Sequence, residues 1–165
     1  AGRAPRGAVP IMPPTMNAPI DLAAIKATAA KRAQDLKLPY AGALTPGEAY
    51  ALMEAGAKLV DVRATPEVLY VGRVPGSVLV EWATYPGHQR NPEFLAQLAQ
   101  AVQPGDTLLF LCRSGNRSHG AAAAAAQAGW ESYNVLEGFE GDKDAAQHRG
   151  TLGGWRKAGP PWVQS

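Results

Sequence analysis

The chain has 165 residues and a formal net charge of +2, with 46% hydrophobic and 18% charged residues. This length and composition fit one folded domain rather than a disordered chain. The small net charge gives no bulk electrostatic reason to expect a nucleic acid or a membrane as partner. The single cysteine excludes an internal disulfide and a multi-thiolate metal site, and the three histidines lack the spacing of a zinc motif. We therefore expect neither a metal nor a cofactor.

The first fifteen residues are rich in proline and glycine and lack the apolar segment of a secretory signal. We interpret residues 1–15 as a flexible native arm or a remnant of expression. Residues 16–43 are predicted to be a helical extension, and residues 44–165 the catalytic domain. This organisation predicts a cytoplasmic protein.

The first predicted elements are two helices and a strand. Residues from Asn17 to Leu36 have a loose apolar face and predict a helix. The segment Thr45-Pro46-Gly47-Glu48 is a capping box with proline at the first helical position, which predicts a second helix ending near Ala55. Residues Lys58 to Val62 are predicted to form a short buried strand.

The second half alternates strands with helices. A short strand is expected at Val78–Val80, and a helix after Asn91-Pro92. Residues Thr107 to Leu111 are apolar after the first, as in a central parallel strand covered on both faces. An alanine-rich helix is predicted from about Ser118 to Ala128, and a strand at Tyr133–Leu136. This alternation predicts an α/β fold, with a parallel sheet and helices on both faces.

The segment Cys112-Arg113-Ser114-Gly115-Asn116-Arg117 joins the central strand to the alanine-rich helix. Parallel α/β folds bind ligands at the carboxyl ends of their strands, which is where this segment lies. The N–H groups and dipole of the helix start, together with Arg113 and Arg117, favour a negative charge there, and Gly115 allows the backbone to bend. These features would stabilise Cys112 as a nucleophilic thiolate. Its polar surroundings argue against the alternative that Cys112 is only a small buried apolar residue.

This loop resembles the active-site loop of the rhodanese family: Cys, Arg, any residue, Gly, any residue, then Arg or Thr. Asp61-Val62-Arg63 resembles the strand-end motif of that family, and Gly72–Ser77 resembles its Gly-His-Ile-Pro-Gly-Ala turn, with Arg73 in place of histidine. The similarity runs in the expected order from about Leu44 to about Trp162. It implies a rhodanese-like fold, a five-stranded parallel sheet flanked by helices on both faces.

The resemblance also implies a sulfurtransferase that works through a persulfide. A small anionic donor, thiosulfate or a persulfide, would transfer its sulfane sulfur to Cys112, and Arg113 and Arg117 would assist the departing anion. Loop N–H groups from Arg113 to Ser118 would hold the persulfide. A thiophilic acceptor, cyanide or a thiol, would then remove the outer sulfur, and a protein is also possible as donor or acceptor.

Secondary roles are expected for other residues. In rhodanese-like proteins the strand-end pair, here Asp61 and Arg63, mainly braces the structure. Arg73 either fills a structural role or reaches the mouth of the site. Ser114, Asn116 and Ser118 are candidate side-chain donors, while His119 is not needed as a base. Trp82 and Phe139, both in loops after strands, are expected to wall the pocket.

Three alternatives stay open. A phosphatase or arsenate reductase places five residues between its cysteine and arginine, whereas four separate Cys112 from Arg117, which favours sulfur over a tetrahedral oxyanion. A regulatory module of the same fold would commonly lack one of these two residues. A sulfur relay between proteins would use the same chemistry, with residues 17–36 either docking a partner or only covering the domain.

Overall fold

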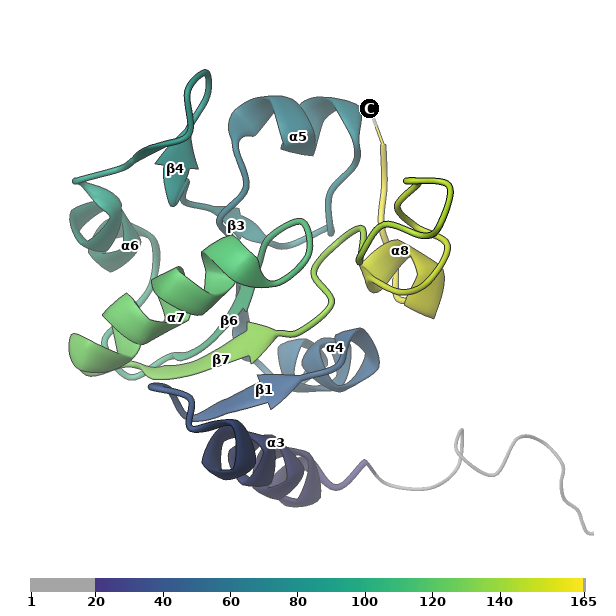
Figure 1. Ribbon diagram of the computed structural model, residues 1–165. Coiled ribbons are helices and arrows are strands. Elements are labelled where there is room, and N and C mark those ends of the chain that lie inside the picture. Colours follow the sequence, from purple (N-terminus) through teal and green to yellow (C-terminus); the bar gives the residue numbers. More distant parts are fainter. Residues whose placement is uncertain (1–19, 165) are drawn as a thin grey trace, which may run out of the picture.

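The computed structural model describes residues 20–164, so the expectation for residues 1–15 lies outside the described part. A parallel sheet of five strands in the order β1-β7-β6-β2-β3 forms its centre (Figure 1). The strands are β1 (Gly42–Leu44), β2 (Lys58–Asp61), β3 (Val78–Leu79), β6 (Thr107–Leu111) and β7 (Glu131–Val135), and β4 (Ala83–Thr84) pairs with β5 (Gln89–Arg90) in a separate antiparallel ribbon. The helices are α3 (Leu22–Leu36), α4 (Pro46–Glu54), α5 (Thr65–Tyr70), α6 (Phe94–Ala101), α7 (Asn116–Gln127) and α8 (Trp155–Ala158). The predicted α/β fold with a five-stranded parallel sheet is confirmed.

The central strand β6 separates two hydrophobic clusters, because successive side chains of a strand point to opposite faces. Leu108 and Phe110 lie in one cluster with residues of α6 and α7, and Leu109 and Leu111 lie in the other with residues of α3, α4 and α8. All four side chains are fully buried. The uninterrupted apolar run of β6 is therefore explained by cover on both sides of the sheet.

Helix α7 lies close to the sheet because its buried face consists of small side chains. Ala121, Ala122 and Ala125 have no exposed surface, and the helix packs against β6 and β7. The predicted start at Ser118 is two residues late, since α7 begins at Asn116 directly after Gly115. The active-site loop is therefore shorter than the sequence indicated.

Helix α3 covers the edge strand β1. The helix begins at Leu22, where the side chain of Asp21 caps it by accepting the Ala24 N–H at 3.0 Å, and the predicted start near Asn17 lies outside the described residues. A Cβ added to Gly42 would lie 2.6 Å from the carbonyl carbon of Ala29, so helix and strand are in close contact. This contact supports the covering role for the helix, while the proposed division of the chain between residues 43 and 44 stays a prediction.

The capping box of α4 is present as predicted, with reciprocal hydrogen bonds between Thr45 and Glu48. Five short elements had no prediction, namely β1, β4, β5, α5 and α8. Strand β1 has three residues, too few for an alternation pattern. Helix α5 has six residues, none of them buried, and hence no apolar periodicity. Among the residues described here, no helix is long and apolar enough to span a bilayer.

Candidate active site

The loop that carries Cys112 leaves β6 at its carboxyl end and is held from behind by the segment after β7. The N–H of Phe139 donates to the carbonyl oxygen of Cys112 at 2.7 Å, and the N–H of Glu140 donates to that of Arg113 at 2.9 Å. A Cβ on Gly138, whose φ is +67°, would lie 2.5 Å from the Arg113 carbonyl carbon. Only a residue without a side chain allows this approach.

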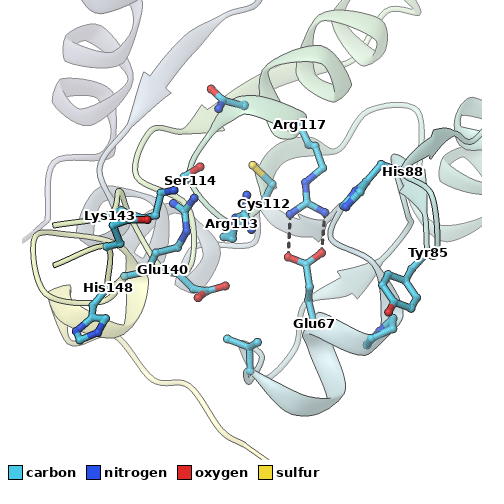
Figure 2. A pocket seen from close by; sticks show the side chains of 15 residues that line it. Glu67, Tyr85, His88, Cys112, Arg113, Ser114, Arg117, Glu140, Lys143 and His148 are labelled. Atoms are coloured by element: carbon cyan, nitrogen blue, oxygen red, sulfur yellow. Dashed lines mark hydrogen bonds and ion pairs between the residues drawn. The ribbon is translucent and has the colours of Figure 1, made fainter. Parts of the chain in front are cut away.

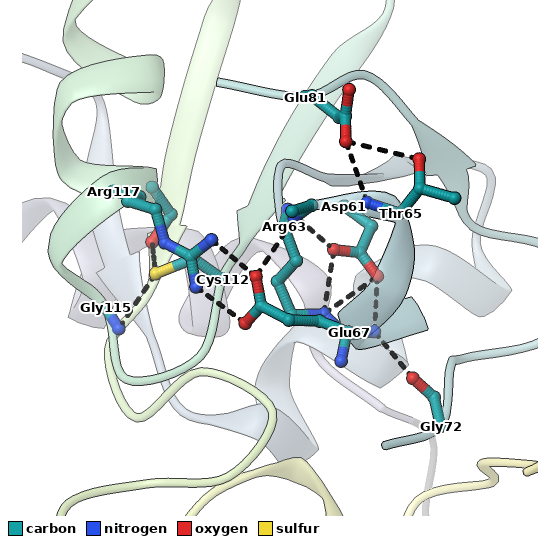
Figure 3. Close-up of polar contacts among 11 residues, drawn as sticks. Asp61, Arg63, Thr65, Glu67, Gly72, Glu81, Cys112, Gly115 and Arg117 are labelled. Carbon is teal, nitrogen blue, oxygen red and sulfur yellow. Dashed lines mark hydrogen bonds and ion pairs between the residues drawn. The ribbon is translucent and has the colours of Figure 1, made fainter. Parts of the chain in front are cut away.

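The sulfur of Cys112 faces the start of α7. Gly115, with φ of +102°, directs its N–H to Cys112 Sγ at 3.1 Å (Figure 3). A side chain on Gly115 would collide with the carbonyl oxygen of Leu136. The hydroxyl of Ser118 lies 3.2 Å from the same sulfur. A backbone donor and the positive end of a twelve-residue helix thus meet at one sulfur atom, an environment that favours negative charge.

A buried chain of polar groups continues behind the sulfur. Ser118 Oγ donates to Asn134 Oδ1 at 2.5 Å, and Asn134 Nδ2 donates to the Gly115 carbonyl oxygen at 3.2 Å and to the Tyr40 hydroxyl at 3.3 Å. The Tyr40 hydroxyl also lies 2.8 Å from Nδ1 of His119. Sequence reasoning missed Asn134 and Tyr40, although an asparagine in a strand followed by Val135 and Leu136 is a signal that a buried partner exists.

Arg117 does not present a free guanidinium to the loop. Its two terminal nitrogens donate to the two carboxylate oxygens of Glu67 at 2.7 and 2.8 Å (Figure 3), and both side chains are about four-fifths buried. Burial alone would raise the pKa of the Glu67 carboxyl, but hydrogen bonds from Arg117 and the Ala64 N–H outweigh it, so that pKa lies below its usual value. The hydrogen bonds to Glu67 raise the pKa of Arg117 against the effect of burial.

Glu67 therefore occupies both terminal nitrogens of Arg117, and an anion would have to displace Glu67 to bind them. Sequence analysis did not select Glu67, because its partner lies 50 residues further along the chain. The available signal was local: Glu67 accepts the N–H of Ala64 and closes the first turn of α5.

Asp61 and Arg63 form a buried ion pair at the end of β2. Arg63 Nη2 lies 2.7 Å from Asp61 Oδ2 and donates to the carbonyl oxygen of Gly72 at 2.8 Å (Figure 3). The Arg63 guanidinium carbon lies 4.3 Å from the centre of the Phe139 ring. These contacts tie the strand end to the Gly72 turn and to the segment that supports Cys112, which is a bracing arrangement.

Cys112 lies in the wall of a cavity of about 880 Å³. Figure 2 shows Lys143 and His148 on one side of Cys112, and Tyr85 and His88 on the other. The lining residues come from α5, the loop after β4, the Cys112 loop and the segment after β7: Pro66, Glu67, Val71, Tyr85, His88, Cys112, Arg113, Ser114, Asn116, Arg117, Glu140, Lys143, Gln147, His148 and Arg149. This volume suits a ligand much larger than a single sulfur atom.

The charge of the cavity is positive once its ion pairs are taken into account. Glu67 is paired with Arg117, and Glu140 lies 3.9 Å from Arg156. Arg113, Lys143 and Arg149 line the cavity without forming an ion pair within residues 20–164. Lys143 and Arg149 were missed because they belong to an irregular segment, which Asp144 organises by accepting the N–H groups of Ala146 and His148.

Other residues selected from the sequence have different places. Ser114 and Asn116 line the cavity, whereas Arg73 is exposed and its backbone pairs with Val163. Trp82 and Phe139, which were expected to wall the pocket, are not among the residues that line this cavity.

Each of the two aromatic side chains packs elsewhere because neighbouring elements offer it an apolar surface. Trp82 lies edge-on to Phe94, with ring centres 5.0 Å apart, and under the guanidinium of Arg90. Phe139 is fully buried against Trp162. In the described part of the chain, no group of three or more His, Cys, Asp or Glu residues is arranged to hold a metal ion.

Cys112 lies on a strand-to-helix loop, at the carboxyl edge of a parallel sheet and beside a cationic cavity, which is where α/β domains place their ligands. Residues 45–145 match the family described as Rhodanese-like domain, and the chain belongs to this family. The resemblance stated from the sequence motifs is thereby confirmed.

Relatives of this chain include proteins with sulfur-transfer names. The chain is 30% identical over 131 residues to Thiosulfate sulfurtransferase 16, chloroplastic, of Arabidopsis thaliana, covering 78% of this chain and 97% of the relative. It is 45% identical to the crystal structure of Rv0390 from M. tuberculosis, with a TM-score of 0.71 over 76% of this chain and 99% of that one. The polysulfide-sulfur transferase homodimer from Wolinella succinogenes shares the fold, with a TM-score of 0.55, 18% identity and coverage of 88% and 95%. The family and the first relative support a sulfurtransferase.

Proposed function

We propose that this protein is a sulfurtransferase that moves a sulfane sulfur from thiosulfate or a persulfide donor to cyanide or a thiol, through a persulfide on Cys112. The observation that carries the proposal is the setting of one sulfur atom. Cys112 Sγ accepts the Gly115 N–H at 3.1 Å at the start of α7, in the wall of a cavity where three cationic side chains form no ion pair among the described residues. Such a setting favours both a thiolate and an anionic donor.

In the first step, the Cys112 thiolate attacks the sulfane sulfur of the donor, having lost its proton to solvent. A sulfur–sulfur bond forms to Cys112, and the bond from the sulfane sulfur to the rest of the donor breaks. With thiosulfate, sulfite leaves with the electron pair of that bond. Arg113, Lys143 and Arg149 attract the donor and stabilise the departing anion, while Arg117 acts from behind Glu67.

In the second step, the acceptor attacks the outer sulfur of the persulfide. Its bond to that sulfur forms as the Cys112–sulfur bond breaks, and the electron pair returns to Cys112 as a thiolate. Cyanide becomes thiocyanate, and a thiolate becomes a persulfide. A covalent intermediate between two half-reactions predicts ping-pong kinetics.

The assignment of Arg117 also bears on the phosphatase alternative. A phosphatase of this general type would direct the loop arginine to a tetrahedral oxyanion, but here both terminal nitrogens of Arg117 bind Glu67. Together with the four-residue spacing, this pairing supports sulfur as the group that is transferred. A cytoplasmic location is part of the proposal, because the one cysteine of the chain is a free thiol that a reducing compartment would preserve.

The deciding experiment is an intact-mass measurement after incubation with thiosulfate. We expect a gain of one sulfur atom, which cyanide removes, and no gain in Cys112→Ser, which should fold as the parent does because serine is nearly isosteric. A folded parent protein with an accessible, reduced Cys112 and no adduct would contradict the proposal. Uptake from a persulfide donor but not from thiosulfate would keep the mechanism and change the donor.

A further inference from the structure

The amide of Asn134 is held in one orientation inside the core. The side chain lies on β7 and is 3% exposed. Its nitrogen lies 3.2 Å from the carbonyl oxygen of Gly115, which can only accept a hydrogen bond, and 3.3 Å from the Tyr40 hydroxyl. The contact with Gly115 therefore fixes which end of the amide is the nitrogen, because the opposite orientation would bring two acceptors together. The oxygen of Asn134 consequently faces Ser118.

Ser118 has a single hydroxyl hydrogen for two neighbours. Its Oγ lies 2.5 Å from Asn134 Oδ1 and 3.2 Å from Cys112 Sγ. Because Asn134 Oδ1 is an acceptor, the hydrogen of Ser118 points to Asn134, and a lone pair of Ser118 Oγ faces the sulfur. A neutral thiol suits this arrangement, since its S–H can donate to Ser118 while the sulfur accepts the Gly115 N–H. A thiolate would face the lone pair without a hydrogen between them.

We propose that Asn134 is a positioning residue that competes with the Cys112 sulfur for the hydroxyl hydrogen of Ser118, and thereby opposes part of the stabilisation that the Gly115 N–H and the start of α7 give to the thiolate. When Cys112 loses its proton to solvent, the hydroxyl turns from Asn134 to the sulfur, and Asn134 Oδ1 gives up its hydrogen bond. The consequence for turnover rests on the proposed function. The equilibrium between the two positions of the Ser118 hydroxyl is independent of the proposed function.

The charged groups around Cys112 form a constant background for this competition. Those nearest in the fold are Arg113 on the loop, Arg117 on α7, Glu67 on α5, and Asp61 and Arg63 at the end of β2; across the cavity lie His88, Glu140, Lys143, His148 and Arg149. At the far end of the polar chain are Tyr40 and His119. A substitution of Asn134 leaves all of these charges in place, so a changed ionisation of Cys112 reports on the hydroxyl of Ser118.

The test measures the rate at which iodoacetamide alkylates Cys112 as a function of pH, with the ultraviolet absorbance of the thiolate as a second signal. The alkylation rate belongs to Cys112, because the chain has one cysteine, and the absorbance is taken as the difference from Cys112→Ser, which removes the contribution of the five tyrosines. Asn134→Val keeps a strand-forming side chain and removes the acceptor. We expect the midpoint of the pH profile to fall by about 0.5 to 1 pH unit, and the rate below the midpoint to rise about three- to tenfold, the effect of freeing one hydrogen bond for the sulfur.

A double-mutant cycle separates this mechanism from general loosening of the loop. In a Ser118→Ala background, Asn134→Val should leave the midpoint unchanged, because the hydroxyl that mediates the effect is gone. Equal shifts in both backgrounds, a rise of the midpoint, or no shift at all would overturn the inference. If Asn134→Val does not fold, Asn134→Ala takes its place in the cycle.

Tyr40→Phe is the matched control. It removes the other partner of the Asn134 nitrogen and keeps the contact with Gly115, so we expect an unchanged midpoint. A fall as large as that of Asn134→Val would contradict the mechanism. The thiosulfate mass measurement distinguishes the two proposals: a protein that alkylates as expected yet takes up no sulfur would contradict the sulfurtransferase proposal alone.

Discussion

Replacing Glu67 by glutamine tests the role assigned to the Glu67–Arg117 pair. Glutamine keeps the shape and one acceptor oxygen but removes the charge and the second acceptor. Breaking a fully buried pair costs about 3–5 kcal/mol, and an exposed pair contributes about 1 kcal/mol or less. The two side chains are 21% and 18% exposed, so we expect a loss of about 2 kcal/mol. For a domain of this size, that loss lowers Tm by roughly 4–8 °C.

The pH dependence of this difference has a defined sign. The pKa of Glu67 is lowered in the folded protein from a value of 4.5, so the carboxylate contributes stability above about pH 4.5 and loses that contribution as the pH falls through its folded pKa. The Tm difference between the parent and Glu67→Gln should therefore be full at neutral pH and shrink on acidification below about pH 4.5. Differential scanning calorimetry across this range measures it.

A matched control is Glu54→Gln, which removes an exposed carboxylate at the end of α4 and should leave Tm nearly unchanged. Glu67→Gln also releases the positive charge of Arg117 toward the cavity, so the KM for thiosulfate should fall even as stability drops. Equal melting of parent and Glu67→Gln at neutral pH, or a difference that grows with acidification, would refute the role assigned to the pair.

Two further perturbations test the loop and the cavity. Gly115→Ala should lower the free energy of unfolding by about 2–3 kcal/mol and abolish sulfur uptake, because φ is +102° and the new methyl group meets the Leu136 carbonyl oxygen. Chemical denaturation measures the stability, and the mass assay measures the uptake. A stable, active variant would contradict the assigned loop geometry. Lys143→Gln and Arg149→Gln should each raise the KM for thiosulfate about three- to tenfold with little change in kcat, and added salt should reduce the effect. Lys157→Gln, at an exposed position of α8 and outside the cavity, serves as control; an equal change there would show that net charge alone matters.

The central sheet and the active-site loop were predictable because their signals are local. The apolar run of β6, the capping box at Thr45 and the glycine after Cys112 each act within a few residues of the chain. A parallel strand buried on both faces and a helix capped by its own residues leave the same pattern in many folds. The order of motifs along the chain then supplied the resemblance to the rhodanese family.

The parts that failed depend on partners distant in the chain. Arg117 was expected to bind an anion, and nothing near it indicates Glu67, which α5 brings to it. Trp82 and Phe139 were placed in the pocket because they follow strands, but the aromatic and arginine side chains that pack on them decide their direction. Asn134 was visible as a polar residue in a buried strand, yet its partner Ser118 lies on a different element.

The hydrogen bonds from Phe139 and Glu140 to the carbonyl groups of Cys112 and Arg113 determine the electrical polarity of the loop. A peptide group whose oxygen is engaged on one side presents its N–H on the other and cannot rotate without breaking that bond. With the Gly115 oxygen engaged by Asn134, three oxygens of the loop are bound to partners outside it. Strand β7 and the segment after it thus fix the orientation of these peptide groups, so that their dipoles, like that of α7, act beside the side-chain charges and do not change with ionic strength or protonation.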